Sequence, residues 1–119
     1  YQESMPIEQL VQRVCNYKHA YTQYGGLRPF GVAFLFAGYD EHFGFQLYQS
    51  DPSGNYSGWQ ATVIGQNNQA GKSLLKTDYS SEMSVDAALD LAAKVLLKTM
   101  DTTTPSPDKV EFSILRRCE

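Results

Sequence analysis

The chain has 119 residues, of which 42% are hydrophobic and 19% are charged. This length allows one domain at most, and the composition excludes the low-hydrophobicity, high-charge class of disordered proteins. A net charge of −3, with ten Lys and Arg residues scattered along the chain, argues against a nucleic-acid partner. No apolar stretch approaches the ~20 residues of a membrane span.

A first helix is predicted between Ser4 and the glycine pair at residues 25–26. Ser4 can cap the first turn, and Pro6 is tolerated in that turn. The glycine pair suits a left-handed cap at the other end. One face is expected to be buried, and its apolar residues at helical spacing are Ile7, Leu10, Val11, Val14 and Tyr21.

Three strands joined by short turns are predicted next. Residues 30–37 form a nearly continuous apolar run of strand length, which predicts a strand covered on both faces. A turn is expected at residues 38–42, and alternation of apolar and polar residues over 43–48 predicts a second strand. The return strand is expected at about residues 56–64, so that the three strands form an antiparallel meander.

The turn between the second and third predicted strands is Asp51-Pro52-Ser53-Gly54, called the turn motif below. Pro52 presets φ at the second turn position, and the Asp51 carboxylate can accept backbone N–H groups. Gly54 stands where a type I turn often has no Cβ. The sequence therefore predicts a hairpin with this motif at its tip.

Two further helices and a last strand complete the predicted order. Asn67 or Asn68 can cap a helix that ends before residues 80–81, and its inward residues are expected to be Ala70, Leu74 and Leu75. Ser84 can cap the next helix, whose apolar stripe comprises Val85, Ala88, Leu89, Ala92, Val95 and Leu96. Residues 101–107 predict a linker, and alternation at Val110, Phe112 and Ile114 predicts the final strand.

This order leaves edges and faces without partners. The strand at residues 30–37 needs cover on its second face, and a strand that arrives last needs a neighbour already in place. We therefore expect the chain to be part of a larger layered domain, and isolated copies to pair through their open edges.

Residues 65–73 imitate a phosphate-binding loop, because they follow a strand, open a helix and end in Gly-Lys-Ser. The motif needs four residues between its first glycine and Gly-Lys-Ser, whereas five separate Gly65 from Gly71. A nucleotide-binding module therefore remains only a weaker alternative.

Other reactive side chains form no diagnostic pattern, so we predict no catalytic, cofactor-binding or metal-binding residue. Ser53 and Ser57 lie outside a nucleophile elbow. The two histidines, His19 and His42, have no partner at metal-ligand spacing. The remaining candidates have simpler explanations as free thiols (Cys15, Cys118), helix-end acids (Asp78, Glu82, Asp86, Asp90) and cross-strand aromatic pairs (Phe45, Tyr48, Tyr56, Trp59).

Several segments in order resemble the alpha subunits of the 20S proteasome. They are residues 20–26 with 28–32, 44–59, 61–62 with 64–65, and 98–101. The resemblance implies an α+β fold, namely part of the N-terminal-nucleophile hydrolase sandwich, in which two antiparallel sheets lie between two helical layers. Residues 1–119 would be the C-terminal part of one such domain, with the first strands, the first long helix and the N-terminal gate segment lying upstream.

The same resemblance implies a non-catalytic, structural subunit of the alpha ring. Such a subunit supports assembly, substrate gating and regulator docking in ubiquitin- and ATP-dependent protein degradation. The implied partners are other alpha subunits, beta subunits and regulatory particles, without cofactor, nucleic acid or membrane. The implied location is the cytoplasm and the nucleus.

A catalytic N-terminal-threonine hydrolase is the main alternative within this family. Active beta subunits begin with a processed threonine, whereas this chain begins with Tyr1. Their Gly-Ser-Gly-Ser turn corresponds here to residues 65–68, Gly-Gln-Asn-Asn, and their accessory aspartate falls within the threonines at 102–104. Without these groups we expect no hydrolytic activity.

Overall fold

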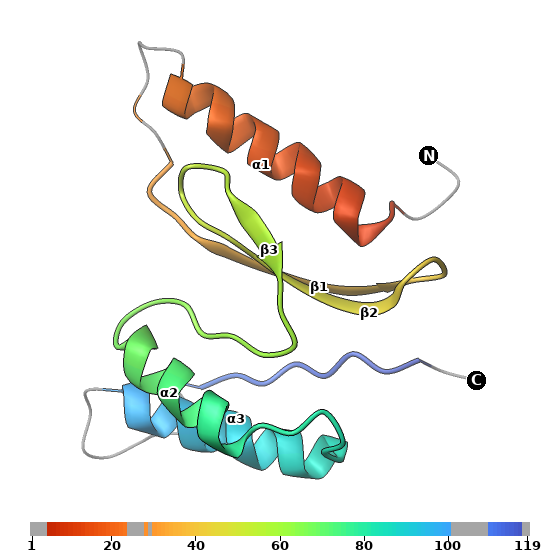
Figure 1. The fold of residues 1–119 in the computed structure, drawn as a ribbon, viewed down its shortest axis with the longest axis vertical. Coiled ribbons are helices and arrows are strands. Elements are labelled where there is room, and N and C mark those ends of the chain that lie inside the picture. Colours follow the sequence, from red (N-terminus) through yellow and green to blue (C-terminus); the bar gives the residue numbers. More distant parts are fainter. Residues whose placement is uncertain (1–4, 24–27, 29, 101–109, 118–119) are drawn as a thin grey trace. The chain divides into compact units, whose positions relative to one another are not determined.

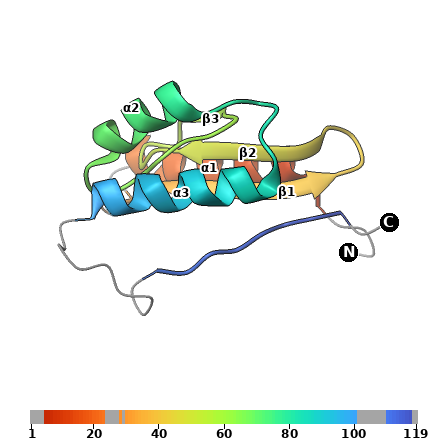
Figure 2. The same cartoon turned by 90° about the horizontal axis from the view of Figure 1, so that it is seen from below.

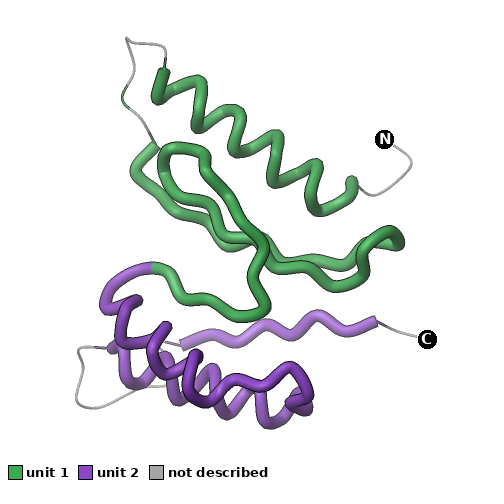
Figure 3. Tube along the Cα trace, in the orientation of Figure 1, with its two compact units in different colours: residues 1–64 green, residues 65–119 purple. Residues whose placement is uncertain are grey.

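The computed structural model describes residues 5–23, 28, 30–100 and 110–117 (Figure 1). Its elements occur in the order helix, three strands, helix, helix, which confirms the α+β class. The chain divides into two compact units, residues 1–64 and 65–119 (Figure 3). The predicted cap at Ser4, the glycine pair at 25–26 and the linker at 101–107 lie outside the described residues.

Helix α1 spans Ile7–Gln23 and buries Val11, Cys15 and Lys18. These positions follow the i, i+4, i+7 spacing of one helical face. The predicted face is partly wrong, because Leu10 and Tyr21 are 39% and 37% exposed. Val11 belongs to both the predicted and the observed face, whereas Cys15 and Lys18 are buried without having been predicted.

The three strands of the first unit form the predicted antiparallel meander in the order β1-β2-β3. Strand β1 spans Phe34–Asp40, β2 spans Gly44–Ser50 and β3 spans Tyr56–Gly58. Phe34 pairs with Ser50 in the first ladder, and Ser50 pairs with Tyr56 in the second. Helix α1 contacts β1 and β2 and lies along the sheet (Figures 1 and 2).

Both ends of β1 differ from the prediction. The strand begins at Phe34 rather than at residue 30, and the carbonyl of Val32 accepts a hydrogen bond from Lys18 instead of a ladder bond. It continues to Asp40, so residues 38–40 are not a turn. The Asp40 carboxylate closes the turn that follows by accepting the N–H groups of His42 and Phe43 at 3.0 and 2.8 Å.

The third strand is also shorter than predicted, since it ends at Gly58 instead of residue 64. The N–H of Trp59 still donates to Leu47 O at 2.9 Å. Beyond it, Thr62 reaches β2 through its side chain, with Oγ1 donating to Gln49 Oε1 at 2.6 Å. A side-chain contact replaces the backbone ladder at this end.

The strands have one covered face and one open face among the described residues. Gly38 is buried against Ile7 of α1. On the alternate positions Leu35 is 42% exposed and Phe45 is 56% exposed. Among the described residues of the first unit, the second face of the strand therefore has no cover, which agrees with the expectation that this cover must come from further structure.

The second unit contains α2 (Asn68–Asp78) and α3 (Val85–Thr99), which pack against each other. Gly71 of α2 is buried together with Leu91 and Val95 of α3. The predicted stripe of α3 is only partly correct, because Val85 is 45% exposed and Ala88 and Ala92 are exposed as well. Asn67 is the N-cap residue of α2, in the left-handed conformation, and its side-chain amide donates to Thr99 O at 3.0 Å.

The predicted last strand does not form within residues 110–117. Phe112 and Ile114, two of its alternating residues, are 52% and 50% exposed. An alternating sequence forms a ladder only beside another strand, and the described residues of the second unit include none. Within the described ranges, no helix has the length and apolar character needed to cross a bilayer.

Ser84 caps α3 as predicted, with its hydroxyl accepting the N–H of Ala87 at 3.2 Å. Replacing Ser84 with alanine is expected to lower the free energy of unfolding by about 1 kcal/mol, because one N–H at the helix start loses its acceptor. Chemical denaturation of the two proteins measures this difference. Ser84→Asp is the matched control and should retain most of the stability, since aspartate is an equally good cap; equal losses in both variants would contradict the capping role.

Candidate functional site

The turn motif is organised by one carboxylate oxygen. Oδ1 of Asp51 accepts the N–H groups of Ser53, Gly54 and Asn55 at 2.9, 3.1 and 3.1 Å. It also accepts the Ser53 hydroxyl at 2.6 Å. Two backbone bonds complete the turn, from Gly54 N to Asp51 O at 3.2 Å and from Asp51 N to Asn55 O at 2.9 Å. The structure thus places all four residues of the motif together, at the connection between β2 and β3.

These bonds lower the pKa of Asp51. The Ser53 hydroxyl has the largest effect, and the backbone N–H groups of residues 53–55 add to it, whereas partial burial acts in the opposite direction. Hydrogen bonds to the charged form stabilise that form. Asp51 therefore holds the turn as a carboxylate at neutral pH.

The turn motif packs directly on the backbone of α1. A Cβ atom added to Gly54 would lie 2.6 Å from Cys15 O and 3.0 Å from His19 N. Gly54 also has a φ of +103°, a conformation that favours glycine. Nearby, His19 Nδ1 lies 3.2 Å from Ser53 O, within hydrogen-bonding distance. Glycine at this position therefore meets two separate requirements, one of conformation and one of space.

Lys18 lies beneath the turn, and its side chain is fully buried. Its Nζ donates to Ser50 Oγ at 2.8 Å, to Val32 O at 3.0 Å and to Asp51 O at 3.2 Å. The same nitrogen is 4.2 Å from the centroid of the Phe34 ring, a distance typical of a cation–π contact. An ammonium group has three N–H donors, and here each has an acceptor.

Burial lowers the pKa of Lys18, while the charges of Cys15 and Asp51 oppose that change. Burial likewise raises the pKa of the Cys15 thiol, with Lys18 acting in the opposite direction. A lysine that activates a serine must be neutral and must share a site with substrate. Lys18 and Ser50 are each 0% exposed, so this cluster holds the structure together and cannot be reached by a substrate.

Sequence reasoning missed Lys18 and Ser50. The available signal was the spacing of Val11, Cys15 and Lys18, which places a lysine in line with two apolar residues. A lysine at a core position needs acceptors, and its presence there could have indicated a buried polar cluster.

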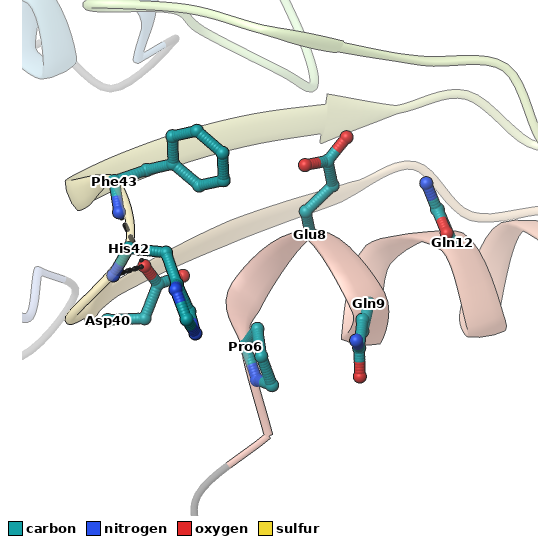
Figure 4. A pocket seen from close by; sticks show the side chains of 7 residues that line it. All are labelled: Pro6, Glu8, Gln9, Gln12, Asp40, His42 and Phe43. Atoms are coloured by element: carbon teal, nitrogen blue, oxygen red, sulfur yellow. Dashed lines mark hydrogen bonds between the residues drawn. The ribbon is translucent and has the colours of Figure 1, made fainter.

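A second feature is a cavity of about 320 Å³ beside the start of α1 (Figure 4). Asp40 is one of the residues that line the cavity. Its pKa is lowered, chiefly by the hydrogen bond from Phe43 N–H and less by those from Gln46, Ile7 and His42, whereas desolvation acts in the opposite direction. Its carboxylate thus accepts hydrogen bonds from the turn, from β2 and from the start of α1. The lining residues are Pro6, Glu8, Gln9, Gln12, Asp40, His42 and Phe43.

The two histidines lie in different places, His19 beside the turn motif and His42 at the cavity. In the described part of the chain, no group of three or more His, Cys, Asp or Glu side chains could hold a metal ion. The described structure therefore offers neither histidine a set of metal ligands.

The loop that imitates a phosphate-binding motif does not have the required geometry. Helix α2 already begins at Asn68, so Gly71 and Ser73 lie inside it. The N–H of Gly71 donates to Asn67 O at 3.3 Å, and the Ser73 hydroxyl donates to Gln69 O at 3.0 Å. These N–H and O–H groups donate to backbone carbonyls of the helix and its cap. This geometry argues against a phosphate site.

The four aromatic residues singled out in the sequence make separate, local contacts. Tyr48 and Tyr56 pack edge to face with centroids 6.3 Å apart, whereas Phe45 packs on Tyr39 at 4.9 Å. The indole N–H of Trp59 donates to Ser57 Oγ at 2.8 Å. These are cross-strand and local contacts of a hairpin.

The remaining candidates are dispersed. Asp78 pairs with Lys94 at 3.0 Å on the surface of the second unit, and Asp86 lies in the first turn of α3. The threonines at 102–104 and Cys118 lie outside the described residues. Of the candidate acids, Asp78 is thus bonded to a lysine and Asp86 lies at the start of a helix, where its charge suits the helix dipole.

Comparisons with known proteins identify relatives of this chain by sequence. The sequence model of the proteasome subunit family matches residues 1–115. Proteasome subunit alpha type-4-A of Arabidopsis thaliana is 60% identical over 113 residues, which are 95% of this chain and 45% of the relative. Proteasome subunit alpha type-4 of Spinacia oleracea has the same values, and that of Dictyostelium discoideum is 60% identical over 114 residues, with 95% and 46% covered.

The chain thus spans about half the length of these relatives. The aromatic residues that flank the turn motif, in residues 45–50 and 55–59, most resemble the type-4 class, and the relatives carry that designation. The match to the family covers both compact units. The resemblance seen in the sequence is confirmed, and the chain belongs to the proteasome subunit family.

Proposed function

We infer that the chain is the C-terminal part of a non-catalytic alpha subunit of the 20S proteasome, of the type-4 class. The observation that carries this proposal is 60% identity to alpha type-4 subunits over 95% of the chain. The complete subunit would contribute to assembly, substrate gating and regulator docking in ubiquitin- and ATP-dependent protein degradation. Its location would be the cytoplasm and the nucleus.

The structure supports a scaffold role in two ways. The buried polar cluster of Lys18 and Ser50 is closed to solvent and fully hydrogen-bonded, so it serves packing. The open face of the sheet, with Leu35 and Phe45 partly exposed, is suited to burial against further structure. In the complete subunit we expect that structure to come from the rest of the same domain, with other alpha subunits, beta subunits and regulatory particles as partners.

Purification of the tagged parent protein from its own cells tests this proposal. We expect other alpha subunits and beta subunits to co-purify in fixed proportions, as measured by mass spectrometry of the intact complex. Gly54→Val in the same protein is the matched control for non-specific capture and should reduce incorporation, because it disrupts the turn motif.

The purified chain should not hydrolyse fluorogenic peptides. Recovery of the parent protein without any proteasome subunit would contradict the assignment to the ring. Peptide hydrolysis that disappears when one side chain of this chain is replaced would contradict the non-catalytic assignment.

A further inference from the structure

Lys18 connects α1 to two stretches of the chain that are distant in sequence, residue 32 and residues 50–51. Val32 precedes β1, Ser50 ends β2, and Asp51 begins the turn motif. The lysine stem belongs to the buried face of α1. One nitrogen atom therefore fixes the entry to the first strand and the exit from the second strand against the helix.

The other contacts between the turn motif and α1 fix the orientation of the turn less strictly. Gly54 permits close approach to the helix backbone, but van der Waals contact does not select one orientation as hydrogen bonds do. The His19 contact to Ser53 O is exposed to solvent, at 3.2 Å. Lys18 Nζ supplies the buried, directional bonds.

A buried ammonium gains these bonds at the expense of its hydration. Replacing a whole buried ionic cluster with apolar groups of similar volume is often neutral or stabilising, because the cost of desolvation offsets the attraction. Removing one member alone leaves its partners unpaired and lowers stability. Charged and polar groups in a core can instead determine which arrangement is adopted. Three directional bonds to two distant stretches suit that second role.

We propose that Lys18 is a positioning residue, whose ammonium group holds the turn motif and the approach to β1 in one position on α1. The contribution is local order, which hydrogen exchange of individual amides can separate from global unfolding. The relevant probes are the N–H groups of Asp51 and Gly54, which bond within the turn.

The test compares the wild-type chain with Lys18→Met, which keeps the length of the side chain and removes its donors. We expect the Asp51 and Gly54 amides to exchange at least tenfold faster relative to the ladder amides of β1 and β2. The urea midpoint of global unfolding should fall as well, because the substitution leaves the acceptors of Lys18 without their donor. Lys94→Met is the matched control, because Lys94 is an exposed lysine paired with Asp78. It should leave the turn amides unchanged.

Ser50→Ala removes one of the acceptors of Lys18 and should accelerate the same amides by a smaller factor. Unchanged turn exchange in Lys18→Met would overturn the proposal. So would loss of folding, or an equal acceleration of amides throughout the protein, because either result would mean that Lys18 supplies general stability and no particular order in the turn.

Discussion

Replacing Gly54 with valine is expected to lower the free energy of unfolding by about 3 kcal/mol, the sum of a strained backbone and an overpacked contact. The positive φ of +103° disfavours any side chain there. The added Cβ would also meet Cys15 O at 2.6 Å. This oxygen belongs to the backbone of α1 and cannot move aside by a change of rotamer. Urea denaturation followed by circular dichroism measures the loss.

Gly44→Val separates the two causes. Gly44 also has a positive φ, of +73°, but nothing lies within 4 Å of an added Cβ. This variant should therefore lose only the conformational part, about 1 kcal/mol. If both variants lose the same amount, the close approach of the turn to α1 contributes nothing and the packing described for Gly54 is wrong.

The sequence predicts local contacts better than contacts between distant residues. The turn motif depends on residues within four positions of one another, and local turn preferences are sufficient to place it. Lys18 bonds to residues 14, 32 and 33 positions away. No local pattern specifies those acceptors, so the spacing in the helix could only indicate that a buried lysine needs them.

The elements that were predicted incorrectly depend on partners in space. Helix α3 has apolar residues around much of its circumference, and contact with α2 determines that Leu91 and Val95 are buried. Residues 110–117 alternate as a strand should, yet they remain without a ladder in the described second unit. Periodicity indicates which residues can be buried. Packing against neighbouring elements then selects the face that becomes buried.

Replacing Asp51 with alanine is expected to lower the free energy of unfolding by about 2 kcal/mol at neutral pH. The N–H groups of residues 53–55 and the Ser53 hydroxyl then lose a charged acceptor, and solvent compensates for part of that loss because the turn is partly open. Asp51→Asn is the matched variant, since it keeps a carbonyl oxygen at the same position without the charge. We expect it to retain part of the stability.

The dependence on pH distinguishes the carboxylate from the shape of the turn. Because the pKa of Asp51 is lowered in the folded chain, its contribution is fully present above the unfolded-state value of about 3.9 and is lost as the pH falls through the folded value. The stability difference between wild type and Asp51→Ala should therefore shrink below about pH 4.

Asp40, whose pKa is also lowered, is present in both proteins, so its titration cancels in the comparison. Urea titrations between pH 7 and pH 3 measure this difference; a difference that stays constant over that range would mean that the carboxylate charge does not hold the turn.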